Sequence, residues 1–144
     1  MSGFLLDTNV VSELVKPKPD GNVRRWVDEA DESILFLSAM TLGEIRKGIE
    51  SLGPGARRGR LESWLQVDLR LRFRDRILPI DEAIADRWGA ISAMAAAKGK
   101  PVPVVDGILA ATALHHNLTF VTRNNSDVAG TGVSTLNPWQ SGTR

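Results

Sequence analysis

Four acidic residues of this sequence follow apolar runs or lie near the start of a helical pattern. Asp7 and Asp127 follow predicted strands, whereas Glu44 and Asp106 lie close to predicted helix starts. Ligands of an open parallel sheet bind just beyond the carboxyl ends of its strands, so these four side chains could meet at one edge. Carboxylates that meet repel one another unless a cation neutralises them. We therefore expect an acidic site that captures a hard cation, Mg²⁺ or Mn²⁺.

Taken singly, each of these acids also has a structural explanation. Asp7 and Asp106 belong to the residue types that cap helices. Glu44 could simply face solvent on its helix, and Asp127, in a loop rich in Asn and Ser, could be a turn residue. No single acid therefore decides between a catalytic and a structural role.

Composition narrows the classes of protein and of site. The chain has 144 residues, 42% hydrophobic and 24% charged, with a formal charge of +1, which is ordinary for a globular protein. We expect one domain over residues 1–144, with residues 137–144 as a loose tail. Cysteine is absent and the two histidines, His115 and His116, are adjacent, so a metal would be held by oxygen atoms. No stretch has the pattern of a membrane span or a signal peptide, and we expect a cytoplasmic protein.

Short apolar runs alternate with helical patterns along the whole chain. This alternation predicts βαβ units and an α/β fold, with a mainly parallel, four- to five-stranded sheet covered by helices on both faces. Helices are predicted over residues 10–15, 39–52, 56–74 and 82–97, and from Asp20 and Asp106 onward. The predicted strands are residues 4–6, 33–37, 77–80, 118–122 and 133–136.

The predicted helix over residues 56–74 is rich in arginine. Such a helix could be a solvated face, partly neutralised by nearby acids, or a surface that binds the phosphates of a nucleic acid. Its pattern alone does not decide between them. The arginines of this helix and of the residues just after it are Arg57, Arg58, Arg60, Arg70, Arg72, Arg74 and Arg76.

Several motifs, in order along the chain, resemble those of PIN-domain ribonucleases, and within them the VapC toxins of the FitB-like branch. These motifs are Asp7-Thr8-Asn9 after the first strand, Ser38-Ala39 leading to Glu44, Asp106 before Ile108-Leu109-Ala110-Ala111-Thr112-Ala113, Thr122-Arg123-Asn124 leading to Asp127, and Leu136-Asn137-Pro138-Trp139. The resemblance spans nearly the whole chain. It implies a three-layer PIN-like sandwich.

The resemblance also implies an activity and a division of roles among the residues. The activity is a Mg²⁺- or Mn²⁺-dependent endoribonuclease, with Asp7 and Asp106 as metal ligands and Glu44 and Asp127 completing the catalytic set. Thr8, Asn9, Thr122 and Asn124 are implied to support the metal ligands or to contact a substrate phosphate. The implied partners are an RNA substrate, an inhibitory antitoxin and a second copy of the chain, with DNA contacted only through the antitoxin. Val128 departs from the aromatic residue often found after the fourth acid.

Two other functions remain open at this point. A metal-dependent phosphatase would also use an aspartate after the first strand, although Asn9 stands where one such pattern requires a second aspartate. A non-catalytic partner in a DNA-regulating complex could use the same sheet as a scaffold. Cleavage of RNA by the purified protein would separate these alternatives.

Overall fold

The core of the molecule is a five-stranded parallel sheet in the order β3-β2-β1-β4-β5. The computed structural model describes residues 2–140. The strands of this sheet are short and mostly apolar, as expected for a parallel sheet that is buried on both faces. They are β1 (Phe4–Leu6), β2 (Leu35–Ser38), β3 (Ile77–Leu78), β4 (Thr119–Val121) and β5 (Thr135–Leu136).

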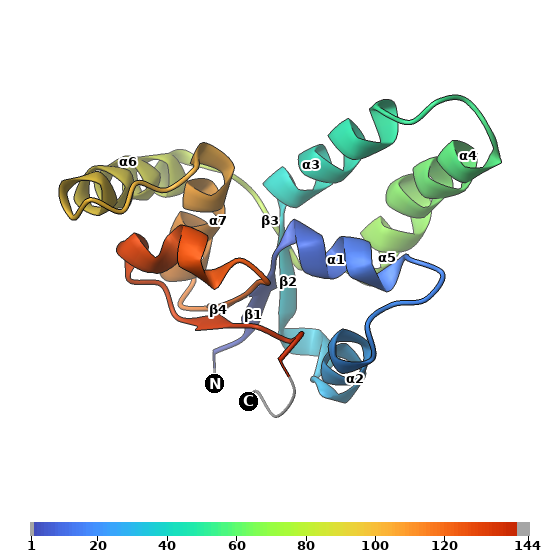
Figure 1. Cartoon of the computed structure of the whole chain (residues 1–144), viewed down its shortest axis with the longest axis horizontal. Helices are drawn as coiled ribbons and strands as arrows, with labels where there is room; N and C mark the ends of the chain where they lie inside the picture. The colour runs from blue at the N-terminus through green and yellow to red at the C-terminus, as the bar shows by residue number, and fades with distance from the viewer. Residues whose placement is uncertain (1, 141–144) are drawn as a thin grey trace.

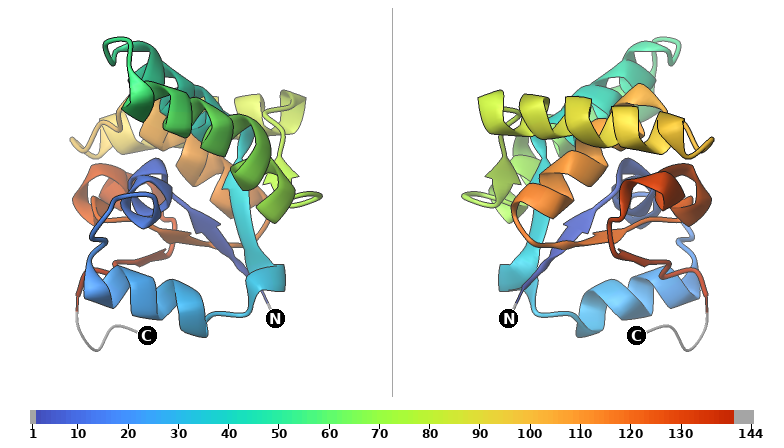
Figure 2. Two further views of the ribbon diagram at one scale, coloured as in Figure 1. Left: turned by 90° about the vertical axis from the view of Figure 1, so that its right-hand side faces the viewer. Right: turned by 90° about the vertical axis from the view of Figure 1, so that its left-hand side faces the viewer.

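Helices cover both faces of this sheet, so the predicted three-layer α/β architecture is confirmed (Figure 1). One face carries α1 (Thr8–Leu14), α2 (Gly21–Glu29), α3 (Ala39–Glu50), α4 (Ala56–Ser63), the π-helical segment η2 (Trp64–Leu69) and α5 (Arg70–Arg72). The other face carries α6 (Glu82–Ala97), α7 (Val104–His115) and the 3₁₀ segment η3 (Asn125–Thr131). Figure 2 shows the first group of helices from one side and the second from the other.

Successive strand residues point into different layers. Leu6 belongs to the core shared with α1 and α2, whereas its neighbour Leu5 belongs to the core shared with α6 and α7. In β4, Phe120 and Val121 divide between the two cores in the same way. This alternation is the two-residue period of a strand, and burial of both faces explains why the strands are continuously apolar in sequence.

Most predicted helix starts are confirmed by their capping hydrogen bonds. The Asp20, Ser38 and Asp81 side chains accept hydrogen bonds from backbone N–H groups in the first turns of α2, α3 and α6. Several expected boundaries are wrong, since α1 begins at Thr8 and not at residue 10, and the helix expected over residues 56–74 is divided by η2 and ends at Arg72. Strand β2 begins at Leu35, because Glu32–Ile34 form a 3₁₀ turn, η1. Strand β3 ends at Leu78, before Pro79, and lies at the sheet edge as the proline predicted.

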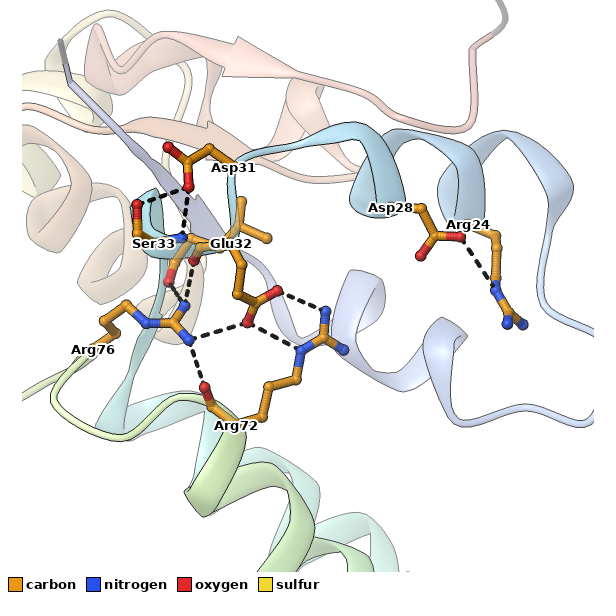
Figure 3. A network of polar contacts seen from close by, with 8 residues as sticks. Arg24, Asp28, Asp31, Glu32, Ser33, Arg72 and Arg76 are labelled. Carbon is orange, nitrogen blue, oxygen red and sulfur yellow. Dashed lines mark hydrogen bonds and ion pairs between the residues drawn. The ribbon is translucent and has the colours of Figure 1, made fainter.

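An arginine–glutamate network fixes the start of β2 to the end of the arginine-rich segment (Figure 3). Arg76 donates to the backbone carbonyls of Glu32 and Leu35, each at 2.6 Å, and to the Glu32 carboxylate at 3.0 Å. Arg72 binds the same carboxylate through two hydrogen bonds of 3.2 and 3.0 Å. These contacts hold the residues just before β3 against the start of β2.

The expected loose tail is wrong as far as the structure describes it. Asn137 and Pro138 are buried, and the Asn22 side chain donates to the Trp139 carbonyl at 2.9 Å. Residues 141–144 lie outside the described residues. Between residues 2 and 140, no helix combines the length and hydrophobicity that crossing a bilayer requires.

Candidate active site

Asp7 and Thr122 follow β1 and β4, the neighbouring strands between which the strand order of the sheet reverses. Strands β2 and β3 lie on one side of β1, and β4 and β5 lie on the other. Leu6 pairs with Val121, so the next residues, Asp7 and Thr122, leave adjacent strands side by side. Such a switch point, at the carboxyl ends of the strands, is where open α/β sheets bind ligands.

The Asp7 carboxylate is held by three hydrogen bonds. Its Oδ1 accepts from the Thr8 backbone N–H at 2.7 Å, which also caps α1. Its Oδ2 accepts from the Thr122 hydroxyl at 2.7 Å and from the Asn9 side-chain amide at 3.3 Å. The structural and functional explanations of Asp7 are therefore compatible, since one oxygen caps the helix and the other faces the polar edge of the sheet.

Burial makes Asp7 electrostatically unusual. Only 5% of the residue is exposed, and burial raises the pKa of its carboxyl from 3.8 to about 6. The hydrogen bonds from Thr122 and Thr8 lower this pKa, whereas the charges of Asp106 and Glu44 raise it. Burial and the neighbouring carboxylates disfavour the ionised form of Asp7. A bound cation would stabilise that ionised form.

Glu44 reaches the same edge from α3. Its Oε1 accepts a short hydrogen bond from the Thr8 hydroxyl, which excludes the expectation that this side chain simply faces solvent. Thr41, one turn earlier, is fully buried with its hydroxyl 3.4 Å from that of Thr8. Thr41 was not among the predicted site residues, although a polar residue three positions before Glu44 lies on the same helical face.

Asp106 and Asp127 complete the acidic edge, but neither lies quite where the sequence placed it. Helix α7 begins at Val104 with Pro103 as its N-cap, so Asp106 lies inside the first turn instead of opening the helix. Asp127 does not follow β4 directly but lies in the 3₁₀ segment η3 and is exposed. Burial raises the pKa of Asp106, and the charges of Asp127 and Glu44 raise it further. All four predicted acids therefore act within one electrostatic neighbourhood.

The remaining predicted residues differ in how they contact Asp7. The Thr122 hydroxyl both donates to Asp7 and accepts from the Asn124 backbone N–H at 3.0 Å. Asn124 thus contributes its backbone to the site, while the residue itself is exposed. Asn9 donates to Asp7, but its own Oδ1 is buried and has no hydrogen-bond partner within residues 2–140.

The donor set fits a hard divalent cation. Asp7, Glu44, Asp106 and the orphaned Asn9 Oδ1 supply only oxygen atoms, the ligands that Mg²⁺ and Mn²⁺ prefer. No three of the described acidic and histidine side chains gather closely enough to surround one ion by themselves. Mg²⁺ sites usually combine one or two carboxylates with several waters, so two aspartates are sufficient.

The C-terminal motif supports the loop that carries Thr122. The Asn137 side chain donates to the Arg123 carbonyl at 3.4 Å, and the Arg123 guanidinium lies 5.0 Å from the centre of the Trp139 ring. These contacts hold the backbone immediately after Thr122. Residues 137 and 139 therefore help to position the site.

Comparison with known proteins agrees with this geometry. The PIN domain family model matches residues 4–130. Toxin FitB of Neisseria gonorrhoeae is 38% identical over 94% of this chain and 98% of its own length, and VapC ribonuclease Y4jK of Sinorhizobium fredii is 35% identical over 95% and 98%. A solved structure of FitAB bound to the IR36 DNA fragment superposes with a TM-score of 0.90 at 36% identity, over 95% of this chain and 96% of that one. The chain belongs to the PIN domain family.

Proposed function

We propose that this protein is a divalent-metal-dependent endoribonuclease and the toxin of a toxin–antitoxin pair. The observation that carries the proposal is the placement of Asp7 at the switch point of the sheet, where Thr8 and Thr122 hold its carboxylate and the Thr8 hydroxyl binds Glu44. Burial raises the pKa of Asp7, and the charge of Asp106 on the same edge raises it further. The names of the relatives, a toxin and a VapC ribonuclease, support the same activity.

In the proposed site, Asp7 and Asp106 hold Mg²⁺ or Mn²⁺, and Glu44 and Asp127 complete the acidic wall. When bound, the ion supplies Lewis-acid polarisation of a phosphodiester and a water of lowered pKa. The protein's part is positioning. Thr122 and the Thr8 N–H hold the two oxygens of Asp7, and the Thr8 hydroxyl holds Glu44, so the carboxylates do not have to reorganise when RNA binds.

Glu44 and Asp127 are proposed to orient and deprotonate the attacking water. The two residues differ in surroundings, since Glu44 is half-buried and hydrogen-bonded to Thr8 whereas Asp127 is exposed on η3. A fixed carboxylate suits orientation, and an exposed one suits proton exchange with solvent. Attack on the phosphodiester would leave a 5′-phosphate and a 3′-hydroxyl.

The proposed partners follow from the same assignment. They are an RNA substrate, an antitoxin that inhibits the nuclease, and a second copy of this chain, with DNA contacted through the antitoxin. The solved FitAB structure contains a DNA fragment, which supports an assembly of this kind. Under this proposal the protein acts in the bacterial cytoplasm, where its RNA is found.

The test is cleavage of RNA by the purified protein in Mg²⁺, in Mn²⁺ and in EDTA. Asp7→Asn should abolish cleavage, whereas Asp28→Asn, which removes the same charge from an exposed position on α2, should not. Sequencing of RNA 5′ ends after expression without antitoxin, beside the Asp7→Asn control, would identify the targets. Full activity of Asp7→Asn would refute the assignment, and release of phosphate from small esters without RNA cleavage would favour a phosphatase.

A further inference from the structure

Glu13 is a buried carboxylate that has no part in the proposed catalysis. Among residues 2–140, the buried acidic residues are Asp7 and Glu13, and they lie at opposite ends of helix α1. Burial disfavours an unpaired charge, and the negative end of the helix dipole disfavours an acid in the last turn. Glu13 therefore depends on the groups that bind its carboxylate, and these groups show which segments it joins.

The Glu13 carboxylate fastens the link between α1 and α2. Its Oε1 accepts a hydrogen bond from Lys16 Nζ at 2.8 Å, and its Oε2 accepts one from the Asp20 backbone N–H at 2.8 Å. The hydrogen bond from Lys16 lowers the pKa of Glu13, and the bond from Asp20 and the charge of Arg123 lower it further. One carboxylate thus holds both ends of the link, Lys16 and Asp20, against the last turn of α1.

Asp20 connects this link to the C-terminal segment. Its side chain caps α2 by accepting hydrogen bonds from the backbone N–H groups of Asn22 and Val23. The Asn22 side chain in turn donates to the Trp139 carbonyl at 2.9 Å. Helix α2 therefore joins Glu13 to residues near the other end of the chain.

The C-terminal segment leads back to Asp7. The Arg123 guanidinium lies 5.0 Å from the centre of the Trp139 ring. The preceding residue, Thr122, donates its hydroxyl to the Asp7 carboxylate at 2.7 Å. Asp7 is the N-cap of α1, and Glu13 lies in the last turn of the same helix. The contacts therefore form a closed circuit, the α1 circuit, which includes α1, the α1–α2 link, α2, the C-terminal segment and the loop after β4.

We infer that Glu13 is a positioning residue, which closes the α1 circuit and thereby fixes the Thr122 hydroxyl and the Asp7 carboxylate for a divalent cation. The inference rests on the proposed function and adds to the site a buried residue that is not itself a metal ligand. At about 1.5 Å per residue, α1 is only about 10 Å long, so a shift of its last turn moves its first turn as well. Substitution of residues that orient metal ligands from outside typically costs about 10- to 100-fold in metal affinity or activity.

The test measures the affinity for Mn²⁺, with MnCl₂ as the titrant and free Mn²⁺ read by electron paramagnetic resonance, together with kcat and KM for RNA cleavage. The variant is Glu13→Gln, and the matched control is Glu32→Gln. Each substitution neutralises a carboxylate that two other residues bind, but Glu32 lies just before β2, at the opposite end of the strands from the site (Figure 3). Both variants should therefore lose stability, and only Glu13→Gln should disturb the site.

Glu13→Gln should raise the Mn²⁺ Kd about tenfold and lower kcat to a similar degree, while the KM for RNA changes less than about twofold. Glu32→Gln should change the Kd and kcat less than about twofold, because it lies far from the site. Equal effects of the two variants on the Kd would overturn the inference, because Glu13 would then act only through the stability of the fold.

Amide hydrogen exchange adds a readout that a role in stability alone would not move. The backbone N–H groups of Asp7 and Thr122 donate to strand carbonyls, each at 2.9 Å. In Glu13→Gln these two amides should exchange faster relative to the amides of α7, which lie outside the α1 circuit. A change in global stability would instead speed the protected amides of both regions alike, and that result would contradict the inference.

Asn22→Ala interrupts the α1 circuit at a second point, by removing the hydrogen bond to the Trp139 carbonyl. It should raise the Mn²⁺ Kd about fivefold, since the net contribution of one hydrogen bond is lost. The double variant should bind Mn²⁺ no more than about twofold more weakly than Glu13→Gln alone, because both substitutions open the same circuit. Fully additive effects would show that the two residues act independently and that the circuit has no role. Should Glu13→Gln fail to fold, an unchanged Kd in Asn22→Ala would refute the inference by itself.

Two outcomes separate this inference from the proposed function. If the wild-type protein fails to cleave RNA but Glu13→Gln still binds Mn²⁺ about tenfold more weakly than the wild-type protein, the inference stands and the proposed nuclease function fails. If Glu13→Gln cleaves RNA poorly but matches the wild-type protein in Mn²⁺ binding and in hydrogen exchange, the nuclease function stands and Glu13 does not position the metal ligands.

Discussion

Asp7→Asn should stabilise the protein against unfolding when no divalent cation is present. The buried carboxylate is disfavoured as an anion by its surroundings, by Asp106 and by Glu44. A neutral amide of nearly the same shape removes that cost. A substitution that abolishes a nuclease while strengthening its fold is the behaviour expected of a residue that binds a cation.

The magnitude follows from the pKa of Asp7. A carboxyl with a pKa of about 6 in the folded protein and 3.8 in the unfolded chain binds its proton more tightly when folded. Its unfavourable contribution is complete above about pH 6, decreases as the pH falls from 6 to 3.8, and vanishes below 3.8. At 1.36 kcal/mol per pKa unit the cost at pH 7 is about 3 kcal/mol. The effect of the substitution should grow from about 0.5 kcal/mol at pH 4 to this upper value at pH 7.

The local hydrogen bonds can accommodate the amide. Its oxygen can keep the bond from the Thr8 N–H, and the Thr122 hydroxyl can accept instead of donate. Asn9 can rotate its amide so that the unpaired Oδ1 accepts from the new NH₂ group. The buried Thr122 O–H then loses its acceptor, so the stabilisation should fall below the upper value given by the pKa of Asp7.

Urea unfolding of the wild-type protein, Asp7→Asn and the control Asp28→Asn, in EDTA at pH 4 and pH 7, measures this difference. Addition of Mg²⁺ at 100 times its Kd should stabilise the wild-type protein by about 2.7 kcal/mol and leave Asp7→Asn unchanged. If Asp7→Asn is no more stable than the wild-type protein at pH 7, or if Mg²⁺ stabilises both equally, the electrostatic account of the site is wrong.

Two further predictions concern the scaffold. The Arg76 side chain is 16% exposed and binds three carbonyls and a carboxylate. Arg76→Gln should therefore cost about 2–3 kcal/mol. The matched control is Arg24, whose exposed ion pair with Asp28 spans 3.7 Å. Arg24→Gln should cost only about 0.5 kcal/mol or less. Equal unfolding free energies for the two variants would show that the network in Figure 3 is dispensable. At Gly130, an added Cβ would lie 2.8 Å from the backbone carbonyl oxygen of Lys100, whereas at Gly89, on α6, it would meet open space. Gly130→Ala should therefore destabilise by about 1–3 kcal/mol. Gly89→Ala should stabilise by about 0.5–1 kcal/mol. Thermal unfolding of this pair checks the contrast, and a stabilised Gly130→Ala would contradict it.

Where the sequence analysis failed, the cause was packing or a local turn that residue type does not encode. Proline at 103 and two valines begin α7 before Asp106, although aspartate is the better capping residue. Residues 137–139 were expected to begin a loose tail, yet they pack because Arg123 and Asn22 provide partners from distant parts of the chain. The arginines of residues 56–76 look alike in sequence, and only the positions of Glu32 and Glu50 divide them into paired and unpaired groups.

The sequence alone determined the strands, the alternation with helices and the four acids, because strand burial and the acids at strand and helix ends leave local patterns. Only the tertiary structure decided that Asp7 lies against Thr122 and that Glu44 meets Thr8. These relations join residues up to 115 positions apart. They depend on strand order and on how helices cross the sheet, which no short stretch of sequence specifies.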